Sequence, residues 1–133
     1  MTIEGDGMAK KILIAEDSST MRSLIASTIT AMGDFTIVEA ANGFEALRIL
    51  PREKVDMVIT DINMPDINGL ELVSFVKGNP NYRNTPLVII STEGSERDRE
   101  KGLTLGADAY LVKPFEPARL QDLVQRFLQE EGR

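Results

Sequence analysis

Residues 55–77 read Val-Asp-Met-Val-Ile-Thr-Asp-Ile-Asn-Met-Pro-Asp-Ile-Asn-Gly-Leu-Glu-Leu-Val-Ser-Phe-Val-Lys. The first six residues, Val55–Thr60, are mostly apolar, as in a parallel strand that is covered on both faces. A loop is expected over Asn63–Gly69 because Pro, Asn, Asp and Gly cluster there, and a helix is expected over Leu70–Lys77. The stretch therefore predicts a strand, a loop and a helix, with Asp61 directly after the strand.

Short apolar runs alternate with amphipathic segments along the rest of the chain. Four more strands are expected, at residues 11–15, 35–39, 87–90 and 109–112. Five strands that alternate with five helices are typical of an α/β fold, in which a parallel sheet carries helices on both faces. Since crossovers between parallel strands are right-handed, few topologies remain, and we expect the flavodoxin-like strand order 2-1-3-4-5.

The expected helices show capping residues and apolar residues at a period of 3.6. Ser18 or Ser19 is suited to cap the first helix and Gly33 to end it, while Asn42-Gly43 opens the second and Pro51 stops it. The apolar positions of the first helix are Met21, Leu24, Ile25, Thr28, Ile29 and Met32. A polar fourth helix is expected over Ser95–Leu105. The last helix has one apolar face, made by Leu120, Leu123, Val124, Phe127 and Leu128.

Composition limits the classes of function. The chain has 133 residues, a length that suits one domain, and its net charge of −6 argues against nucleic acid or an anionic membrane as the main partner. It has no histidine and no cysteine, which removes the commonest general base and the usual zinc ligands. Any catalysis is therefore expected to use carboxylates, hydroxyls, lysine and a bound cation.

Features of the two ends predict where the domain lies and where the protein works. No apolar run reaches the roughly 18 residues that span a bilayer, and Met1–Gly7 is too polar for a signal peptide. We expect a cytoplasmic protein with a loose tail over residues 1–8 and one domain over residues 9–133. Because the last helix runs almost to the C-terminus, no output domain is expected after it.

Polar residues follow four of the five expected strands. In open parallel sheets, ligands bind outside the carboxyl ends of the strands. The residues at those ends are Glu16-Asp17, Asp61, Ser91-Thr92 and Lys113-Pro114. Each signal is weak by itself: a lone Asp or a Glu-Asp pair at a strand end most often caps a helix, Ser-Thr is common after a strand, and Lys-Pro alone indicates little. Their joint placement on one rim favours a functional site.

The residue types at this rim favour phosphoryl transfer. Three clustered carboxylates repel one another, and Mg²⁺, which prefers carboxylates and waters, relieves that repulsion. Lys113 supplies a positive charge for Asp61 at rest and for a phosphoryl oxygen later, and the Ser91 hydroxyl supplies a hydrogen bond. Since phosphoryl transfer depends mainly on positioning and charge neutralisation, Asp61 is the expected covalent acceptor.

The chain resembles the CheY-type receiver domains of two-component response regulators, over about residues 9–130. The matching pieces are Ile14-Ala-Glu-Asp17, Val58-Ile-Thr-Asp-Ile-Asn-Met-Pro-Asp-Ile-Asn-Gly-Leu-Glu71, Ile89-Ile-Ser91 and Ala109-Tyr-Leu-Val-Lys-Pro-Phe115. The resemblance implies that Asp61 accepts a phosphoryl group from a histidine kinase or phosphotransfer domain. It also implies that Mg²⁺ is bound by Glu16, Asp17, Asp61 and the backbone carbonyl of Asn63.

The resemblance assigns roles to five further positions. Lys113 contacts the phosphoryl group and is expected to precede a cis Pro114. Ser91 and Tyr110 form the switch, and a downstream protein is expected on the face made by the fourth helix, fifth strand and fifth helix. Asn63 and Glu93 tune hydrolysis, and this pair, which is similar to that of chemotaxis CheY, implies a short-lived phosphoryl group. Apart from its own phosphorylation and dephosphorylation, the protein is not expected to be an enzyme.

Three other functions are weighed against this one. A phosphatase of the haloacid-dehalogenase type needs a second acid two residues after its nucleophile, where this chain has Asn63. A flavodoxin-like cofactor carrier needs a phosphate-binding loop after the first strand, where Glu16-Asp17 would repel phosphate. A receiver-like docking scaffold that works without phosphorylation would not need the complete set of acidic, hydroxyl and lysine residues.

Overall fold

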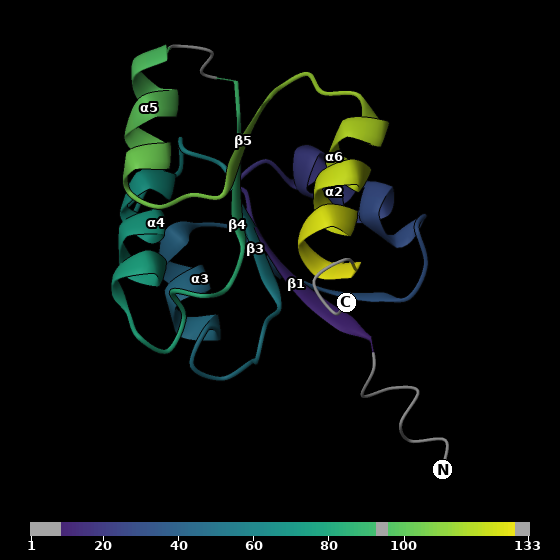
Figure 1. Cartoon of the computed structure of the whole chain (residues 1–133), viewed down its shortest axis with the longest axis horizontal. Coiled ribbons are helices and arrows are strands. Elements are labelled where there is room, and N and C mark those ends of the chain that lie inside the picture. The colour runs from purple at the N-terminus through teal and green to yellow at the C-terminus, as the bar shows by residue number, and fades with distance from the viewer. Residues whose placement is uncertain (1–8, 93–95, 130–133) are drawn as a thin grey trace.

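Five parallel strands form one sheet (Figure 1), and their order, β2-β1-β3-β4-β5, confirms the expected topology. The structure is a computed structural model that describes residues 9–92 and 96–129. The strands are β1 (Lys10–Ala15), β2 (Phe35–Ala40), β3 (Met57–Thr60), β4 (Leu87–Ser91) and β5 (Ala109–Val112). The central strand, β3, is buried along its whole length.

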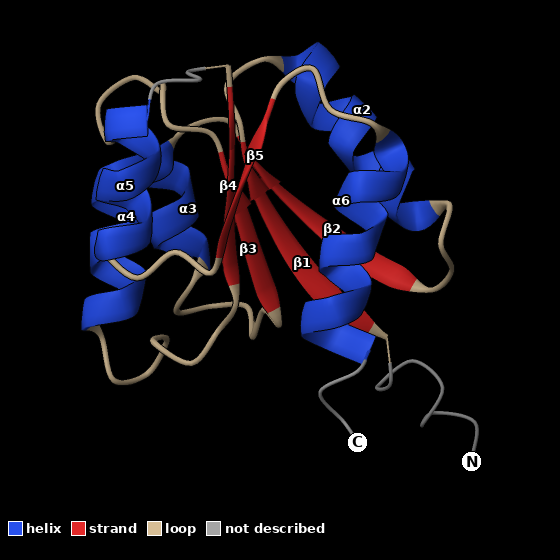
Figure 2. Cartoon of the chain, turned by 45° about the horizontal axis from the view of Figure 1, so that its top comes forward, coloured by secondary structure: helices blue, strands red, loops and turns tan. Residues whose placement is uncertain are grey.

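Helices cover both faces of the sheet. They are α2 (Ser19–Thr30), α3 (Gly43–Ile49), α4 (Gly69–Gly78), α5 (Glu96–Thr104) and α6 (Pro117–Val124), which a π-helical segment, Gln125–Gln129, continues. Figure 2 shows α3, α4 and α5 on one side of the sheet and α2 and α6 on the other. Within the described residues, no helix is long and apolar enough to cross a membrane.

The alternation of side chains along β1 builds two core layers. Ile12 and Ile14 pack in the cluster that includes residues of α2 and α6, whereas Leu13 and Ala15 pack in the cluster that includes residues of α3 and α4. All four side chains are fully buried. This follows from the period of two along a strand, which sends successive side chains to opposite faces of the sheet.

Side-chain caps set the starts of three helices. The Met21 N–H donates to Ser18 Oγ over 3.2 Å, and the Glu45 N–H donates to Asn42 Oδ1 over 2.8 Å. Asn68 and Glu71 form a reciprocal capping box, in which each side chain accepts from the other residue's N–H over 2.9 Å. Such caps satisfy N–H groups that have no partner within the helix.

Some details of the prediction differ from the structure. β3 begins at Met57 because the Asp56 carboxylate, rather than the backbone, accepts the Lys11 N–H, over 2.8 Å. Leu24, expected in the core, is 46% exposed because it lies at the edge of the apolar stripe of α2. The expected tail over residues 1–8 and the expected helix start at Ser95 lie outside the described residues.

Candidate functional site

The carboxyl ends of the strands converge because backbone hydrogen bonds continue just past the strands. The Glu16 N–H donates to the Ala40 carbonyl over 3.0 Å, and the Asp61 N–H donates to the Ala15 carbonyl over 3.0 Å. The Lys113 N–H likewise donates to the Ser91 carbonyl over 2.9 Å. The residues that follow β1, β3 and β5 are therefore held at one rim of the sheet, as the sequence predicted.

Three carboxylates form a cluster at this rim. Glu16, Asp17 and Asp61 each offer an oxygen, and the three oxygens lie within 4.8 Å of one another. Glu16 and Asp61 are buried, at 2% and 7% exposure, whereas Asp17 is exposed. Oxygen ligands at this spacing, with one side open to solvent, fit a hard divalent cation that keeps several waters.

Lys113 lies against the cluster, but its nearer partner differs from the expected one. Its Nζ is 2.7 Å from Glu16 Oε1 and 3.7 Å from Asp61 Oδ2, and its side chain is 8% exposed. The ion pair expected with Asp61 is present, yet the shorter contact is to Glu16. The Lys113–Pro114 peptide bond is cis, as expected.

Backbone N–H groups orient the two buried carboxylates. The Ser18 N–H donates to Glu16 Oε2 over 3.0 Å, so both oxygens of Glu16 have a donor. The Ile62 N–H donates to Asp61 Oδ1 over 2.8 Å, while Asp61 Oδ2 faces Lys113. Each carboxylate is thus fixed in direction before any ligand binds.

The Asp61 carboxyl group is held in a setting that opposes its ionisation. Burial raises its pKa above the ordinary value, and the nearby charge of Glu16 raises it further. Lys113 and the Ile62 N–H lower the pKa, and Asp17 adds a smaller increase. The surroundings of Asp61 therefore make its ionisation harder than in the unfolded chain, and a nearby cation would offset this effect.

The helix that follows Asp61 comes very close to it. The Gly69 N–H donates to the Ile62 carbonyl over 2.8 Å, which folds the Asn63–Asn68 loop back on itself. A Cβ at Gly69 would lie 2.0 Å from the Asp61 carbonyl oxygen. Only glycine allows the start of α4 to approach the strand end this closely.

The predicted switch and tuning residues are placed as follows. Ser91 is fully buried at the end of β4, the strand next to β3. Tyr110 is half-buried on β5 and packs against the core layer on the α3 and α4 side. Asn63 is exposed two residues after Asp61, and Glu93 lies outside the described residues. The structure thus places Ser91 next to the acidic rim and Tyr110 on the neighbouring strand.

Arg22 belongs to the same rim, although no sequence pattern predicted a role for it. Its Nη1 donates to the Glu16 carbonyl over 2.7 Å, and its Nε donates to Glu39 Oε1 over 2.8 Å. Nothing in the sequence marks this arginine, because an arginine in the first turn of a helix is most often solvated.

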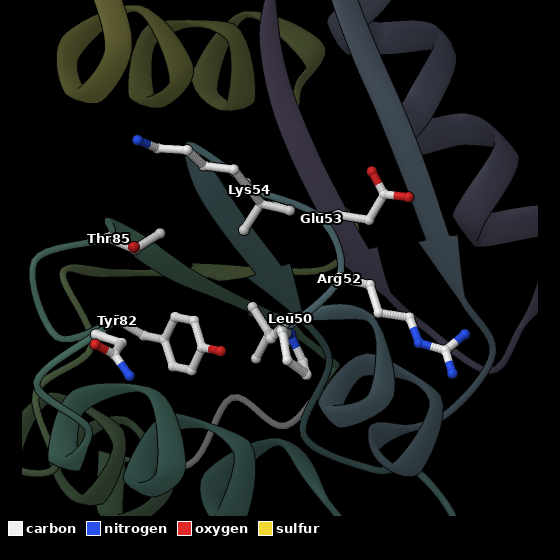
Figure 3. Close-up of a pocket in the computed structure, with 9 residues that line it drawn as sticks. Leu50, Arg52, Glu53, Lys54, Tyr82 and Thr85 are labelled. Carbon is white, nitrogen blue, oxygen red and sulfur yellow. The ribbon is translucent and has the colours of Figure 1, made fainter.

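A hollow lies before the amino ends of β3 and β4, away from the carboxylates. It has a volume of about 420 Å³ and is lined by Leu50, Pro51, Arg52, Glu53, Lys54, Val55, Asn81, Tyr82 and Thr85. Figure 3 shows the Tyr82 ring directed toward Leu50, while the side chains of Arg52 and Lys54 extend away from each other. Because its cations diverge and it contains none of the predicted site residues, this hollow is not the candidate site.

Several known proteins are similar to this chain in sequence and in fold. A chemotaxis protein CheY homolog of Campylobacter jejuni is 40% identical over 119 residues, covering 89% of this chain and 92% of that protein. The structure of chemotaxis protein CheY4 from Vibrio cholerae matches with a TM-score of 0.83 at 35% identity, covering 90% and 99% of the two chains. The receiver domain of sensor histidine kinase PA1611 from Pseudomonas aeruginosa, solved with a magnesium ion in its active site cleft, matches with a TM-score of 0.83 at 27% identity, covering 92% and 99%.

The family model agrees with these relatives. Residues 12–125, which include every strand except the first two residues of β1, match the response regulator receiver domain. The matching CheY4 structure has the same overall fold as the five-stranded domain seen here. The chain therefore belongs to the response regulator receiver domain family and is a CheY-like member of it.

Proposed function

We propose that this receiver domain accepts a phosphoryl group on Asp61, in a Mg²⁺-dependent reaction, from a phosphohistidine of a histidine kinase or phosphotransfer domain. One observation carries the proposal: Asp61 shares a carboxylate cluster with Glu16 and Asp17, and Lys113 Nζ lies 3.7 Å from its Oδ2. The cluster gathers negative charge around a carboxylate and leaves one side open. That arrangement suits a carboxylate that accepts a phosphoryl group while a cation is bound beside it.

The donor set fits Mg²⁺. We assign Glu16, Asp17, Asp61 and the backbone carbonyl of Asn63 as its ligands, directly or through water. The related receiver domain of PA1611 holds magnesium in its active site cleft, which supports the assignment. When bound, the cation supplies the positive charge that lets carboxylates and phosphoryl oxygens come together.

The reaction uses groups that are already oriented. A carboxylate oxygen of Asp61 attacks phosphorus, so that an O–P bond forms as the P–N bond of the phosphohistidine breaks. The Ile62 N–H holds the other carboxylate oxygen in place during the attack. Lys113 then moves its ammonium group from Glu16 Oε1 toward a phosphoryl oxygen, a shift allowed by its position between the two acids.

The switch is proposed to run from Ser91 to Tyr110. The hydroxyl of Ser91 moves toward the phosphoryl group, and the Tyr110 ring follows it inward. The changed face is made by α5, β5 and α6, which are the fourth helix, fifth strand and fifth helix of the domain. A hollow of about 400 Å³ lies on this face and is the proposed binding site for a downstream protein. Its lining residues are Tyr110, Leu111, Val112, Pro114, Phe115, Glu116 and Arg119.

Turnover and pathway are proposed from the same likeness. Asn63 and Glu93 are assigned to tuning the hydrolytic water, which gives a short-lived phosphoryl group. The CheY names of the relatives support a role in chemotaxis signalling.

The receiver domain is taken to cover residues 9–133 after a tail over residues 1–8. It works in the cytoplasm without direct contact with nucleic acid or membrane, and it catalyses only its own phosphorylation and dephosphorylation.

Acetyl phosphate tests the acceptor assignment. The unmodified chain, incubated with Mg²⁺ and acetyl phosphate, should gain the mass of one phosphoryl group, as measured by intact-protein mass spectrometry. Asp61→Asn should gain none, whereas Asp66→Asn, in the exposed loop that follows, should behave like the unmodified chain. Full labelling of Asp61→Asn would refute the assignment.

Two further measurements on the unmodified chain distinguish the proposed receiver from a docking scaffold and from a phosphatase. A docking scaffold predicts no change in unfolding temperature on addition of beryllofluoride and Mg²⁺, whereas the proposed receiver should be stabilised because the ligand binds only the folded state. A phosphatase predicts repeated turnover of p-nitrophenyl phosphate, which the proposed receiver should lack.

A further inference from the structure

Arg22 bridges two strand ends directly behind the acidic cluster. It lies in the first turn of α2, where its N–H donates to the Ser18 carbonyl over 2.8 Å. Its side chain as a whole is 18% exposed, so most of its surface is shielded from solvent. The side chain reaches past the loop that carries Glu16 and Asp17.

The guanidinium group makes two hydrogen bonds in different directions. Nη1 donates to the backbone carbonyl of Glu16 over 2.7 Å, and Nε donates to the carboxylate of Glu39 over 2.8 Å. Glu39 lies on β2, paired with Ile14 of the neighbouring β1. The planar guanidinium fork therefore connects the end of β2 to the loop after β1, which a single ammonium group could not do with the same geometry.

These bonds complete the fixation of Glu16. Its N–H donates to the Ala40 carbonyl, and its two carboxylate oxygens accept from Ser18 and Lys113. Its carbonyl, held by Arg22, is part of the rigid peptide plane that ends at the Cα of Asp17. Arg22 thereby sets the direction in which the exposed Asp17 side chain leaves the backbone.

We propose that Arg22 is a positioning residue for the metal site, with Glu39 as its anchor. Holding the Glu16–Asp17 peptide keeps the Asp17 carboxylate within reach of Asp61 and so sets the affinity of the cluster for Mg²⁺. Glu39 keeps the guanidinium group in place and away from the acidic ligands. This inference rests on the proposed function, because it assumes that the cluster binds Mg²⁺.

The sign of the effect separates positioning from plain electrostatics. Replacing Arg22 by a neutral residue removes a positive charge near an acidic site, and by Coulomb's law alone that change should strengthen the binding of a cation. Loss of positioning should weaken it instead. Arg48, an exposed arginine on α3, offers the same change of charge away from the site.

The experiment compares Mg²⁺ dissociation constants from two-dimensional NMR titrations of the amide signals around Asp61. For Arg22→Ala we expect binding about tenfold weaker, as for other residues that orient metal ligands. Arg22→Lys should stay at least about threefold weaker, because one ammonium group cannot keep both bonds, whereas Arg48→Ala should bind within about twofold of the unmodified chain. Unfolding temperatures measured in EDTA identify which variants are folded. If Arg22→Ala is not folded, the Mg²⁺ affinity of Arg22→Lys tests the inference in its place.

Two results would overturn the inference. The first is unchanged or tighter Mg²⁺ binding in the folded Arg22 variants, and the second is an equal loss in Arg48→Ala. If the unmodified chain itself failed to bind Mg²⁺, the proposed function would fail and the inference with it. Binding by the unmodified chain together with unchanged affinity in the variants would overturn the inference alone.

Discussion

Asp61 is folded into surroundings that disfavour its own charge. Its carboxyl group is buried beside Glu16, and its pKa is raised for both reasons. A group whose folded-state pKa exceeds its unfolded-state value binds more protons in the folded chain, so stability falls as pH rises through that window. The ionised carboxylate therefore costs stability near neutral pH, and a bound cation would offset this cost.

We expect Asp61→Asn to raise the unfolding temperature near neutral pH in the absence of Mg²⁺. The increase should be about 4 °C, which corresponds to roughly 1 kcal/mol for a domain of this size. It should shrink as pH falls through the raised folded-state pKa, and it should be lost well below the unfolded-state value of about 3.9, where the aspartate is protonated in both states. Circular dichroism melts at several pH values measure the effect.

The control for this prediction is Asp66→Asn in the exposed loop after β3. Asp66 has a backbone φ of 68°, a conformation that asparagine also tolerates. Its substitution should therefore leave the unfolding temperature nearly unchanged. A lower unfolding temperature for Asp61→Asn near neutral pH would contradict the idea that this carboxylate is destabilised by its surroundings.

At the scale of elements, the approach of α4 to β3 defines the shape of the acceptor loop. The capping box of Asn68 and Glu71 starts the helix, and Gly69 brings that start against the backbone of Asp61. Packing of Leu72, Val73 and Val76 in the core holds the helix there. The loop between the two elements is consequently short and fixed at both ends.

Gly69→Ala should destabilise the fold strongly. Its Cβ would lie 2.0 Å from the Asp61 carbonyl oxygen and 2.8 Å from the Ile62 Cα, which are backbone atoms that cannot rotate away. We expect a loss of about 2 kcal/mol or more in the free energy of unfolding, similar to other overpacked sites. Urea titrations followed by circular dichroism measure this loss.

Gly78→Ala, at the other end of the same helix, is the matched control. A Cβ at Gly78 meets nothing within 4 Å, so alanine should stabilise the helix by about 0.5–1 kcal/mol. Equal effects of the two substitutions would show that helix propensity, rather than the close approach to Asp61, governs both positions.

At the scale of the whole molecule, the site and the proposed output face lie on different parts of one sheet. The acidic rim belongs to β1 and β3, whereas Tyr110 lies on β5 and is separated from β3 by β4. Among the described residues of α5, only Gly102 is buried, which leaves this helix anchored by few apolar contacts. A helix held so lightly is suited to shift when the strand beside it changes.

Beryllofluoride with Mg²⁺, which mimics a phosphoryl group, should therefore change the structure of the α5 and β5 face as well as that of the acidic rim. We expect amide shift changes at Leu103, which is 37% exposed and lies on α5. Ser91→Ala should weaken this distant response at least several-fold, because it removes the hydroxyl group that is proposed to couple the two places, and such coupling is typically worth only 1–3 kcal/mol. The response around Asp61 should remain. Two-dimensional NMR spectra of both proteins measure it.

Ser74→Ala, an exposed serine on α4, is the control for the switch prediction. It should respond as the unmodified chain does at both places. If Ser91→Ala kept a full response at Leu103, the route through the Ser91 hydroxyl would be wrong, although the acceptor assignment would stand.

The sequence alone was enough to predict the fold class, the strand order and four of the residues that meet at the rim. Strand and helix periods are local properties of the backbone, and the order of a parallel sheet follows from the handedness of its crossovers. Glu16, Asp17, Asp61 and Lys113 could be placed together because each follows a strand of that sheet.

Tertiary structure alone decided which of these residues touch. Lys113 contacts Glu16 more closely than Asp61, across 97 positions of the chain, and Arg22 holds the Glu16 carbonyl. Leu24, which has the right spacing for the core, is exposed. Periodicity sets the face or the end on which a residue lies, but contacts of 2.7–3.7 Å depend on side-chain length and on how distant segments pack, which no local pattern records.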